Sequence, residues 1–200
     1  MTRPVNDLVN IAEALTRQAR SRPDGDALIL PTRRVDGRWQ DRRYSYRQLD
    51  DLSDRLAAGL QAQGFPKGTR VAFMVPPSLE FFALFFALFK AGLVPVLIDP
   101  GIGLKPLKAC LAEARPEVFI GVSRAQLARM LFGWGRGAIR QTVTVGPRPF
   151  WSGLRYKDLL TGNATDFDPP EVTPDDAAAI LFTSGSTGIP KGVVYRHRNF

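Results

Sequence analysis

The sequence is poor in the two residue types that most often build metal centres and disulfide frameworks. It contains one cysteine and one histidine in 200 residues. A single cysteine excludes an internal disulfide framework. Cys110 follows Leu107 at helical spacing, which favours a small buried side chain over a reactive thiol. There is also no zinc-type spacing of ligands, no internal repeat and no low-complexity tract.

The sequence has no apolar run long enough to cross a bilayer, which needs about 20 residues. The longest run is "FFALFFALF" at residues 81–89, between Glu80 and Lys90. It predicts a helix buried on most sides, with docking to lipid or a partner as the alternative. Residues 1–7 lead into an amphipathic segment instead of the apolar core of a secretory signal. We therefore expect a cytoplasmic protein.

Acidic residues are outnumbered, with 19 Asp and Glu against 27 Lys and Arg and a net charge of +8. Part of the excess lies in "RRVDGRWQDRR", residues 33–43, where Asp36 and Gly37 favour a hairpin turn. No recognised nucleic-acid-binding motif accompanies these arginines. A solvated hairpin is therefore favoured over an anion-binding patch, and we expect no nucleic-acid partner.

Strand-like and helix-like segments alternate along the middle of the chain. Strands are expected at residues 69–75, 94–98, 117–122 and 141–145, and helices at residues 80–91, 104–114 and 123–132. Two amphipathic helices, at residues 8–19 and 49–60, flank a hairpin-like pair of strands. The alternation predicts an α/β fold with a mostly parallel sheet flanked by helices.

The stretch "ILFTSGSTGIPKGVVY", residues 180–195, contains two strand-like runs around a polar loop. The loop gathers hydroxyls, glycines and one ammonium: Thr183, Ser184, Gly185, Ser186, Thr187, Gly188, Lys191 and Gly192. Glycines tolerate positive φ and let backbone N–H groups approach a ligand closely. Clustered N–H groups, hydroxyls and a cation suit a phosphate chain.

The loop differs from two other motifs that contain glycine and a hydroxyl or a lysine. A Walker A loop requires Gly-Lys-Ser/Thr and a following helix, whereas Lys191 stands between Pro190 and Gly192 and precedes a strand-like run. A nucleophile elbow requires a glycine two residues before Ser186, where Ser184 stands. An ordinary polar turn is the remaining alternative, although a turn does not require so many ligand-type groups.

Residues 183–192, "TSGSTGIPKG", resemble the phosphate loop of the adenylate-forming superfamily, which includes acyl-CoA ligases, luciferases and adenylation domains of peptide synthetases. Two weaker landmarks occur in the expected order. "SYRQL" at residues 45–49 is similar to a T-Y-x-E-L motif, with Ser45 for Thr and Gln48 for Glu. "KAGLVPVLIDP" at residues 90–100 is similar to another motif, with Leu97 in place of a proline. The resemblance covers nearly the whole chain.

The resemblance implies that residues 1–200 are the N-terminal portion of the large adenylate-forming domain, with the rest of that domain and a small C-terminal domain absent. It implies attack of a carboxylate on the α-phosphate of ATP, departure of pyrophosphate and formation of an acyl-AMP, with Mg²⁺ sharing the charge. It assigns the ATP phosphates to Thr183, Ser184, Gly185, Ser186, Thr187, Gly188 and Lys191. It places no catalytic residue and no metal ligand in these 200 residues.

A finer resemblance connects residues 81–101 and 180–200 with the β-lactone synthetases of bacterial olefin biosynthesis, which adenylate long-chain β-hydroxy acids. A long-chain fatty-acid–CoA ligase, which also uses CoA, is the alternative. A non-catalytic nucleotide- or acyl-binding fragment is the alternative of another class. Association with other olefin-pathway enzymes or with a membrane surface stays open. His197 lies in "RHRN", similar to the family's T-H-R-N, where starting a helix is favoured over acting as a general base.

Overall fold

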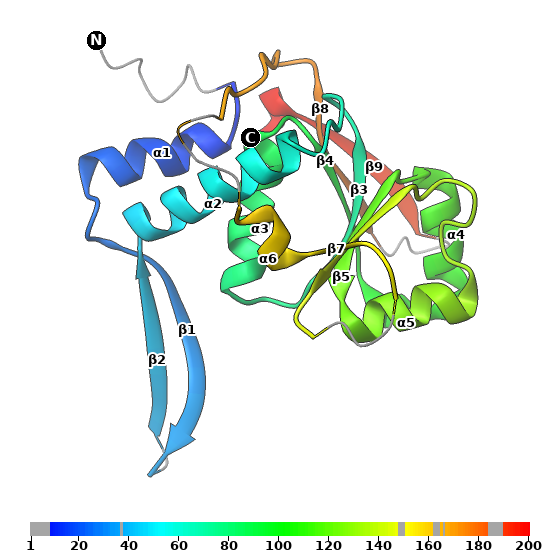
Figure 1. Cartoon of the computed structure of the whole chain (residues 1–200), viewed down its shortest axis with the longest axis horizontal. Coiled ribbons are helices and arrows are strands. Elements are labelled where there is room, and N and C mark those ends of the chain that lie inside the picture. The colour runs from blue at the N-terminus through cyan, green and yellow to red at the C-terminus, as the bar shows by residue number, and fades with distance from the viewer. Residues whose placement is uncertain (1–8, 37, 148–150, 162–164, 166, 184–189) are drawn as a thin grey trace.

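The computed structural model describes residues 9–36, 38–147, 151–161, 165, 167–183 and 190–200. These residues form one seven-stranded sheet with strand order β7-β6-β5-β3-β4-β8-β9 and one separate two-stranded hairpin, β1-β2 (Figure 1). The strands are β1 Asp26–Val35, β2 Arg38–Ser45, β3 Arg70–Met74, β4 Val94–Ile98, β5 Val118–Val122, β6 Gln141–Val145, β7 Leu154–Arg155, β8 Ala177–Thr183 and β9 Lys191–Arg196.

The α-helices are α1 Ala12–Ser21, α2 Tyr46–Gln61, α3 Leu79–Lys90, α4 Leu104–Ala114, α5 Ser123–Phe132 and α6 Tyr156–Leu159. Short 3-10 turns lie at Pro100–Ile102 and His197–Asn199. The predicted order of strands and helices between residues 69 and 145 is confirmed. The pair β7 and α6 was not predicted, because a two-residue strand and a four-residue helix leave no periodicity to detect.

The sheet is parallel from β7 to β8, and β9 joins it antiparallel to β8. The prediction of a mostly parallel α/β sheet is therefore confirmed. The central strands β3, β4, β5 and β8 are almost continuously apolar, as parallel strands covered on both faces must be. Val71 of β3, for example, lies between Pro95 of β4 and Val118 of β5 in the register.

Helices cover both faces of the sheet, with α2 and α3 on one side and α4 and α5 on the other (Figure 1). The phenylalanine-rich helix α3 lies in the larger core, where Leu84, Ala87 and Leu88 are fully buried. The interpretation of residues 81–89 as a buried helix is thus confirmed. Across the sheet, Leu107 and Leu111 of α4 pack around Phe119 of β5.

The arginine-rich segment forms the predicted hairpin, which projects from the body of the molecule (Figure 1). Asp36 has a φ of 48° in its turn, a conformation that aspartate tolerates better than most residues. The hairpin ends at a capping box that begins α2. The Ser45 hydroxyl accepts from the Gln48 amide at 3.3 Å, and the Gln48 side chain accepts from the Ser45 amide at 2.9 Å.

Candidate functional site

The parallel strands bring their carboxyl ends to one edge of the sheet. After β3 the chain enters α3 on one face, whereas after β5 it enters α5 on the other face. Since β3 and β5 are neighbours, the two connections diverge and leave a crevice between them. Crevices at such switch points are the usual ligand sites of open α/β sheets.

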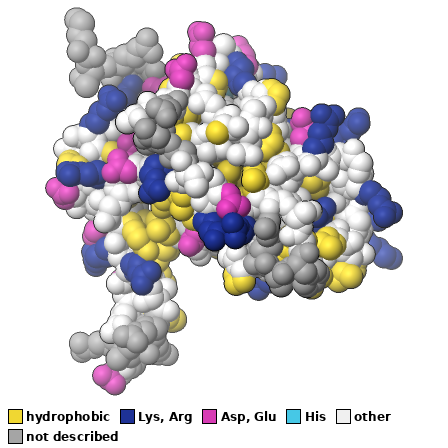
Figure 2. All heavy atoms as spheres, viewed as in Figure 1, with side chains coloured by type: hydrophobic (Ala, Val, Ile, Leu, Met, Phe, Trp, Pro, Cys, Tyr) yellow, Lys and Arg dark blue, Asp and Glu magenta, His cyan; other side chains and the backbone are white. Residues whose placement is uncertain are grey.

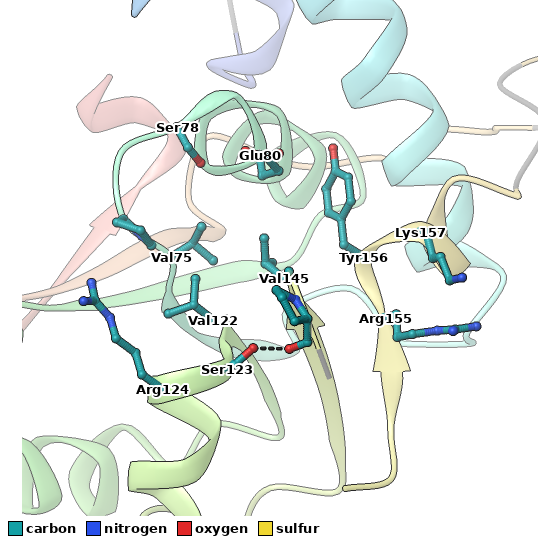
Figure 3. Close-up of a pocket in the computed structure, with 13 residues that line it drawn as sticks. Val75, Ser78, Glu80, Val122, Ser123, Arg124, Val145, Arg155, Tyr156 and Lys157 are labelled. Carbon is teal, nitrogen blue, oxygen red and sulfur yellow. Dashed lines mark hydrogen bonds between the residues drawn. The ribbon is translucent and has the colours of Figure 1, made fainter. Parts of the chain in front are cut away.

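A cavity of about 890 Å³ occupies this position. Its residues follow three neighbouring strands and continue into the starts of α3 and α5 and the region of α6: Val75, Pro76, Ser78, Glu80, Val122, Ser123, Arg124, Val145, Gly146, Pro147, Arg155, Tyr156 and Lys157. In Figure 3, the valines lie between the start of α3, with Ser78 and Glu80, and the start of α5, with Ser123 and Arg124. The volume is in the range typical of small-molecule sites.

The floor of this switch-point cavity is apolar, while its rim carries charges of both signs. Burial raises the pKa of Tyr156 to about 12, and the Glu80 carboxylate adds to this effect. The phenol therefore stays protonated, and remains a hydrogen-bond donor, to a higher pH than an exposed tyrosine. The Ser123 hydroxyl donates to the carbonyl of Pro147 and ties α5 to the end of β6 (Figure 3). The cavity suits an apolar group that ends near polar atoms.

The predicted phosphate loop leaves the same edge of the sheet. Strand β8 runs parallel to β4, and its last residue, Thr183, is paired with Lys191 at the start of β9. The two ends of the loop are thus held side by side, with Lys191 exposed. Ser184, Gly185, Ser186, Thr187 and Gly188 lie outside the described residues, as does the Thr183 side chain. Their assignment to the ATP phosphates stays a prediction.

Gly192 has a different role from the one expected. Its φ is not positive, so it is not required for a turn. A Cβ at this position would lie 2.9 Å from Cζ of Phe182 and 3.3 Å from Oε1 of Glu113. Gly192 therefore lets the Phe182 ring pack against β9 at the base of the loop.

The environment of His197 agrees with a structural role for this residue. Its backbone begins the 3-10 turn that follows β9, and its side chain is 4% exposed. The ring lies 6.4 Å from that of Phe89, and burial lowers the pKa of the imidazole. Cys110 is likewise buried, and burial raises the pKa of its thiol, as expected for an unreactive side chain.

The comparisons with known proteins agree with this arrangement. A family model described as "AMP-binding enzyme" matches residues 15–200. The chain belongs to this family. It is 52% identical over 196 residues to an olefin beta-lactone synthetase of Xanthomonas campestris, covering 96% of this chain and 35% of that protein. The predicted family and the finer resemblance to β-lactone synthetases are therefore confirmed.

Two proteins of lower identity are also similar. A long-chain-fatty-acid–CoA ligase of Mycobacterium tuberculosis is 33% identical over 193 residues, covering 95% of this chain and 35% of the ligase. The N-terminal subdomain of NpsA from Klebsiella oxytoca, solved with 3-hydroxybenzoyl-AMSN, has a TM-score of 0.67 at 27% identity and covers 99% of this chain and 43% of that one. The chain spans about a third of the length of the olefin beta-lactone synthetase and of the CoA ligase.

Proposed function

We propose that this chain takes part in the ATP-dependent activation of a long-chain β-hydroxy fatty acid as acyl-AMP, followed by closure to a β-lactone in olefin biosynthesis. The observation that carries the proposal is the 52% identity to a named olefin beta-lactone synthetase over 96% of the chain. The switch-point cavity and the loop between β8 and β9, which share one edge of the sheet, are consistent with it.

The loop residues would act on the departing phosphates. The hydroxyls of Thr183, Ser184, Ser186 and Thr187, the amides of Gly185 and Gly188 and the Lys191 ammonium would hold the β- and γ-phosphates as the carboxylate attacks the α-phosphate. Such preorganised donors act without reorganisation during the reaction. Expulsion of pyrophosphate leaves the carboxylate oxygen bonded to AMP, which is a far better leaving group than oxide.

Magnesium would neutralise the phosphate charge when ATP is bound. Among the described residues there is no group of three or more His, Cys, Asp or Glu side chains that could hold a metal ion. Mg²⁺ usually keeps several waters and binds through few protein groups and the substrate phosphates. The loop hydroxyls would hold the phosphates beside it.

We assign the switch-point cavity to the apolar part of the acid. Its floor of Val75, Val122 and Val145 offers apolar contact. In the sheet order only β4 lies between β3, whose end lines the cavity, and β8, and strands are about 4.8 Å apart, so an extended acyl chain can reach from the cavity to β8. The Tyr156 phenol would provide a donor at the cavity wall.

Ring closure needs no second substrate. The β-hydroxyl is tethered to the activated carbonyl, and tethering removes the entropy of a bimolecular encounter. The hydroxyl oxygen would form the new bond to the carbonyl carbon, lose its proton and expel AMP. Cleavage of the mixed anhydride would offset the strain of the four-membered ring.

Residues 1–200 would form the N-terminal portion of an AMP-binding domain. The coverage of about a third of each curated relative supports this assignment, as does the match to an N-terminal subdomain. We expect the 200-residue chain to show no turnover alone, because the resemblance assigns it no catalytic residue. We expect the reaction to occur in the cytoplasm, where ATP is supplied, beside other enzymes of the olefin pathway.

The decisive experiment supplies the longer protein that carries this chain with ATP, Mg²⁺ and a long-chain 2-alkyl-3-hydroxy acid. We expect AMP release without CoA and a β-lactone product, detected by mass spectrometry. The matching acid without the 3-hydroxyl should yield no lactone. AMP release that requires CoA, with an acyl-CoA product, would identify a fatty-acid–CoA ligase instead, the function named for the 33% identical relative.

A further inference from the structure

Helix α5 is oriented opposite to the expectation for an amphipathic helix. Its one buried residue is the polar Gln126, which is fully buried and donates from Nε2 to the Val143 carbonyl at 3.0 Å. Its large apolar side chains face outward: Leu127 is 41% exposed, Met130 46%, Leu131 71% and Phe132 42%. Residues 127, 130 and 131 have the spacing of one helical stripe.

The polar side of α5 fixes this orientation. Oε1 of Gln126 accepts from Nε of Arg129 at 3.3 Å, and the Arg129 guanidinium lies 5.8 Å from the centroid of the Phe119 ring. Rotating the helix to bury Leu131 would break the hydrogen bond between the Gln126 side-chain amide and the Val143 carbonyl. The apolar stripe is therefore held in solvent by specific contacts, and an exposed stripe of this kind marks an interaction site.

Basic residues line a groove at one end of the stripe. A groove of about 650 Å³ between the ends of α4 and α5 is lined by Met130, Leu131 and Phe132 together with Lys108, Arg115 and Arg136, and no carboxylate is among its described lining residues. Residues 104–140 contain seven Lys and Arg against two Glu, so they supply most of the net charge of +8. Figure 2 shows dark blue side chains on the side of the molecule that carries α4 and α5.

Both acidic residues of this segment are directed elsewhere. Glu117 pairs with Arg70 at 3.7 Å. Glu113 reaches toward Gly192 of β9, where its Oε1 would lie 3.3 Å from an added Cβ. Neither carboxylate neutralises the groove, so the surface combines apolar side chains with uncompensated positive charge.

We propose that this α5 face, comprising Leu127, Met130, Leu131 and Phe132 with Lys108, Arg115 and Arg136, docks onto an anionic lipid bilayer. The apolar side chains would enter the headgroup–acyl boundary while the cations contact lipid phosphates. Peripheral helices bind membranes in this way, through buried apolar area plus attraction to anionic lipid. No helix in the part of the chain that the structure describes could cross a bilayer, so the contact is peripheral. The docking is independent of the proposed function.

The bilayer is favoured over a protein partner by charge complementarity. Lys108, Arg115 and Arg136 line the groove together with apolar side chains and without a carboxylate, which suits anionic headgroups above an acyl layer. A protein would have to present an apolar insert ringed by carboxylates in matching positions. A second copy of this chain would instead bring like charges together.

The test is co-sedimentation of the longer protein that carries this chain with vesicles of phosphatidylglycerol and phosphatidylcholine. Vesicles of pure phosphatidylcholine are the reference. We expect binding to the anionic vesicles that weakens with salt. Leu131→Ser should reduce binding to the anionic vesicles at least about fivefold. The double variant Arg115→Gln with Arg136→Gln should reduce it about 20-fold, because each cation near an anionic surface contributes about fivefold to binding. The matched controls are Ile29→Ser in the hairpin, 46% exposed, and Arg20→Gln in the exposed part of α1.

Circular dichroism must show that each variant is folded before its binding is scored. Equal effects of Leu131→Ser and Ile29→Ser would overturn the proposal, as would absence of binding to the anionic vesicles. Concentration-dependent dimerisation abolished by Leu131→Ser, without vesicle binding, would assign the face to a protein contact and also overturn it.

Discussion

The ammonium of Lys90 lies 2.6 Å from Oδ1 of Asp50, and the two side chains are only 6% and 10% exposed. The same ammonium contacts Oδ1 of Asp54 at 2.6 Å. Asp50 also accepts from the Thr16 hydroxyl at 2.9 Å, so one buried network joins α1, α2 and α3. Burial raises the pKa of Asp54, which shows that desolvation outweighs the nearby ammonium there.

Replacing Lys90 with methionine should therefore destabilise the protein strongly. The change keeps an apolar stem of similar length but leaves two carboxylates without their cation. Breaking a buried pair from one side typically costs about 3–5 kcal/mol. Urea unfolding followed by circular dichroism measures the loss. As a control, Arg43→Met breaks the exposed pair with Asp26 and should cost less than about 1 kcal/mol. Similar losses for both variants would contradict the role of the network.

Asp176 should make stability depend on pH in the acid range. Its carboxylate accepts from the Thr173 amide at 2.7 Å and from the Lys67 ammonium at 2.9 Å, and these bonds lower its pKa to about 2. Because the folded-state pKa lies below the unfolded one, this stabilisation is present above about pH 4 and is lost as the pH falls toward 2.

The variant Asp176→Asn isolates this contribution. Its unfolding free energy should lie below that of the wild type at pH 6, and the difference should shrink between pH 4 and pH 2. Asp24→Asn is the control, since its carboxylate is 87% exposed and contacts Arg47 at 3.4 Å. A difference that stays constant from pH 6 to pH 2 would argue against the assignment.

The close contact at Gly192 predicts a coupling with Phe182. Gly192→Ala would place a methyl group 2.9 Å from the Phe182 ring, and overpacking of this kind costs about 1–3 kcal/mol. In a Phe182→Leu background the same substitution should cost less, because the shorter side chain makes room. A double-mutant cycle of unfolding free energies tests this. Additive effects would show that the two residues do not conflict.

The switch-point cavity makes a kinetic prediction. Val122→Phe would fill part of its floor and should raise the KM for the long-chain acid by about tenfold, with the KM for ATP nearly unchanged. Steady-state kinetics of the longer protein measure both constants. Ile29→Phe, on the exposed hairpin, is the matched control. Equal rises in both KM values would indicate general damage and not an acyl subsite.

Much of the fold could be predicted because local pattern and tertiary structure agree. The run of residues 81–89 has no polar face, which favoured burial of α3, and the alternation of elements predicted a mostly parallel sheet. Helix α5 was predicted at the correct residues, but its orientation could not be predicted, since Leu127 and Leu131 have core-type spacing yet face solvent while Gln126 is buried. The deciding contact, between Gln126 and Val143, joins residues whose pairing depends on the sheet.

For the candidate site, too, only the part that depends on contiguous residues could be predicted from the sequence. The loop motif was recognisable because its residues are contiguous, and the structure holds its ends, Thr183 and Lys191, in register. The cavity was missed because its walls come from segments separated by up to 82 residues, Val75 to Lys157. The Lys90 network was also not predicted. Two signals in the sequence could have indicated it: the isolated lysine at the end of an apolar helix, and the pair Asp50 and Asp54 one helical turn apart.

The phosphate loop itself makes the sharpest prediction. In the longer protein, Lys191→Ala and Thr187→Ala should each slow adenylate formation by about 10²-fold, the typical effect of removing one preorganised donor. ATP–pyrophosphate exchange measures this step without requiring lactone closure. Lys105→Ala, an exposed lysine on α4, is the matched control and should leave exchange unchanged. Lys191 is the first residue of β9 and its side chain is exposed, so truncating this side chain should not unfold the sheet. A loss of exchange in Lys191→Ala would therefore indicate weaker binding of the ATP phosphates. Wild-type exchange in both loop variants would exclude the assignment and leave the loop as a polar turn.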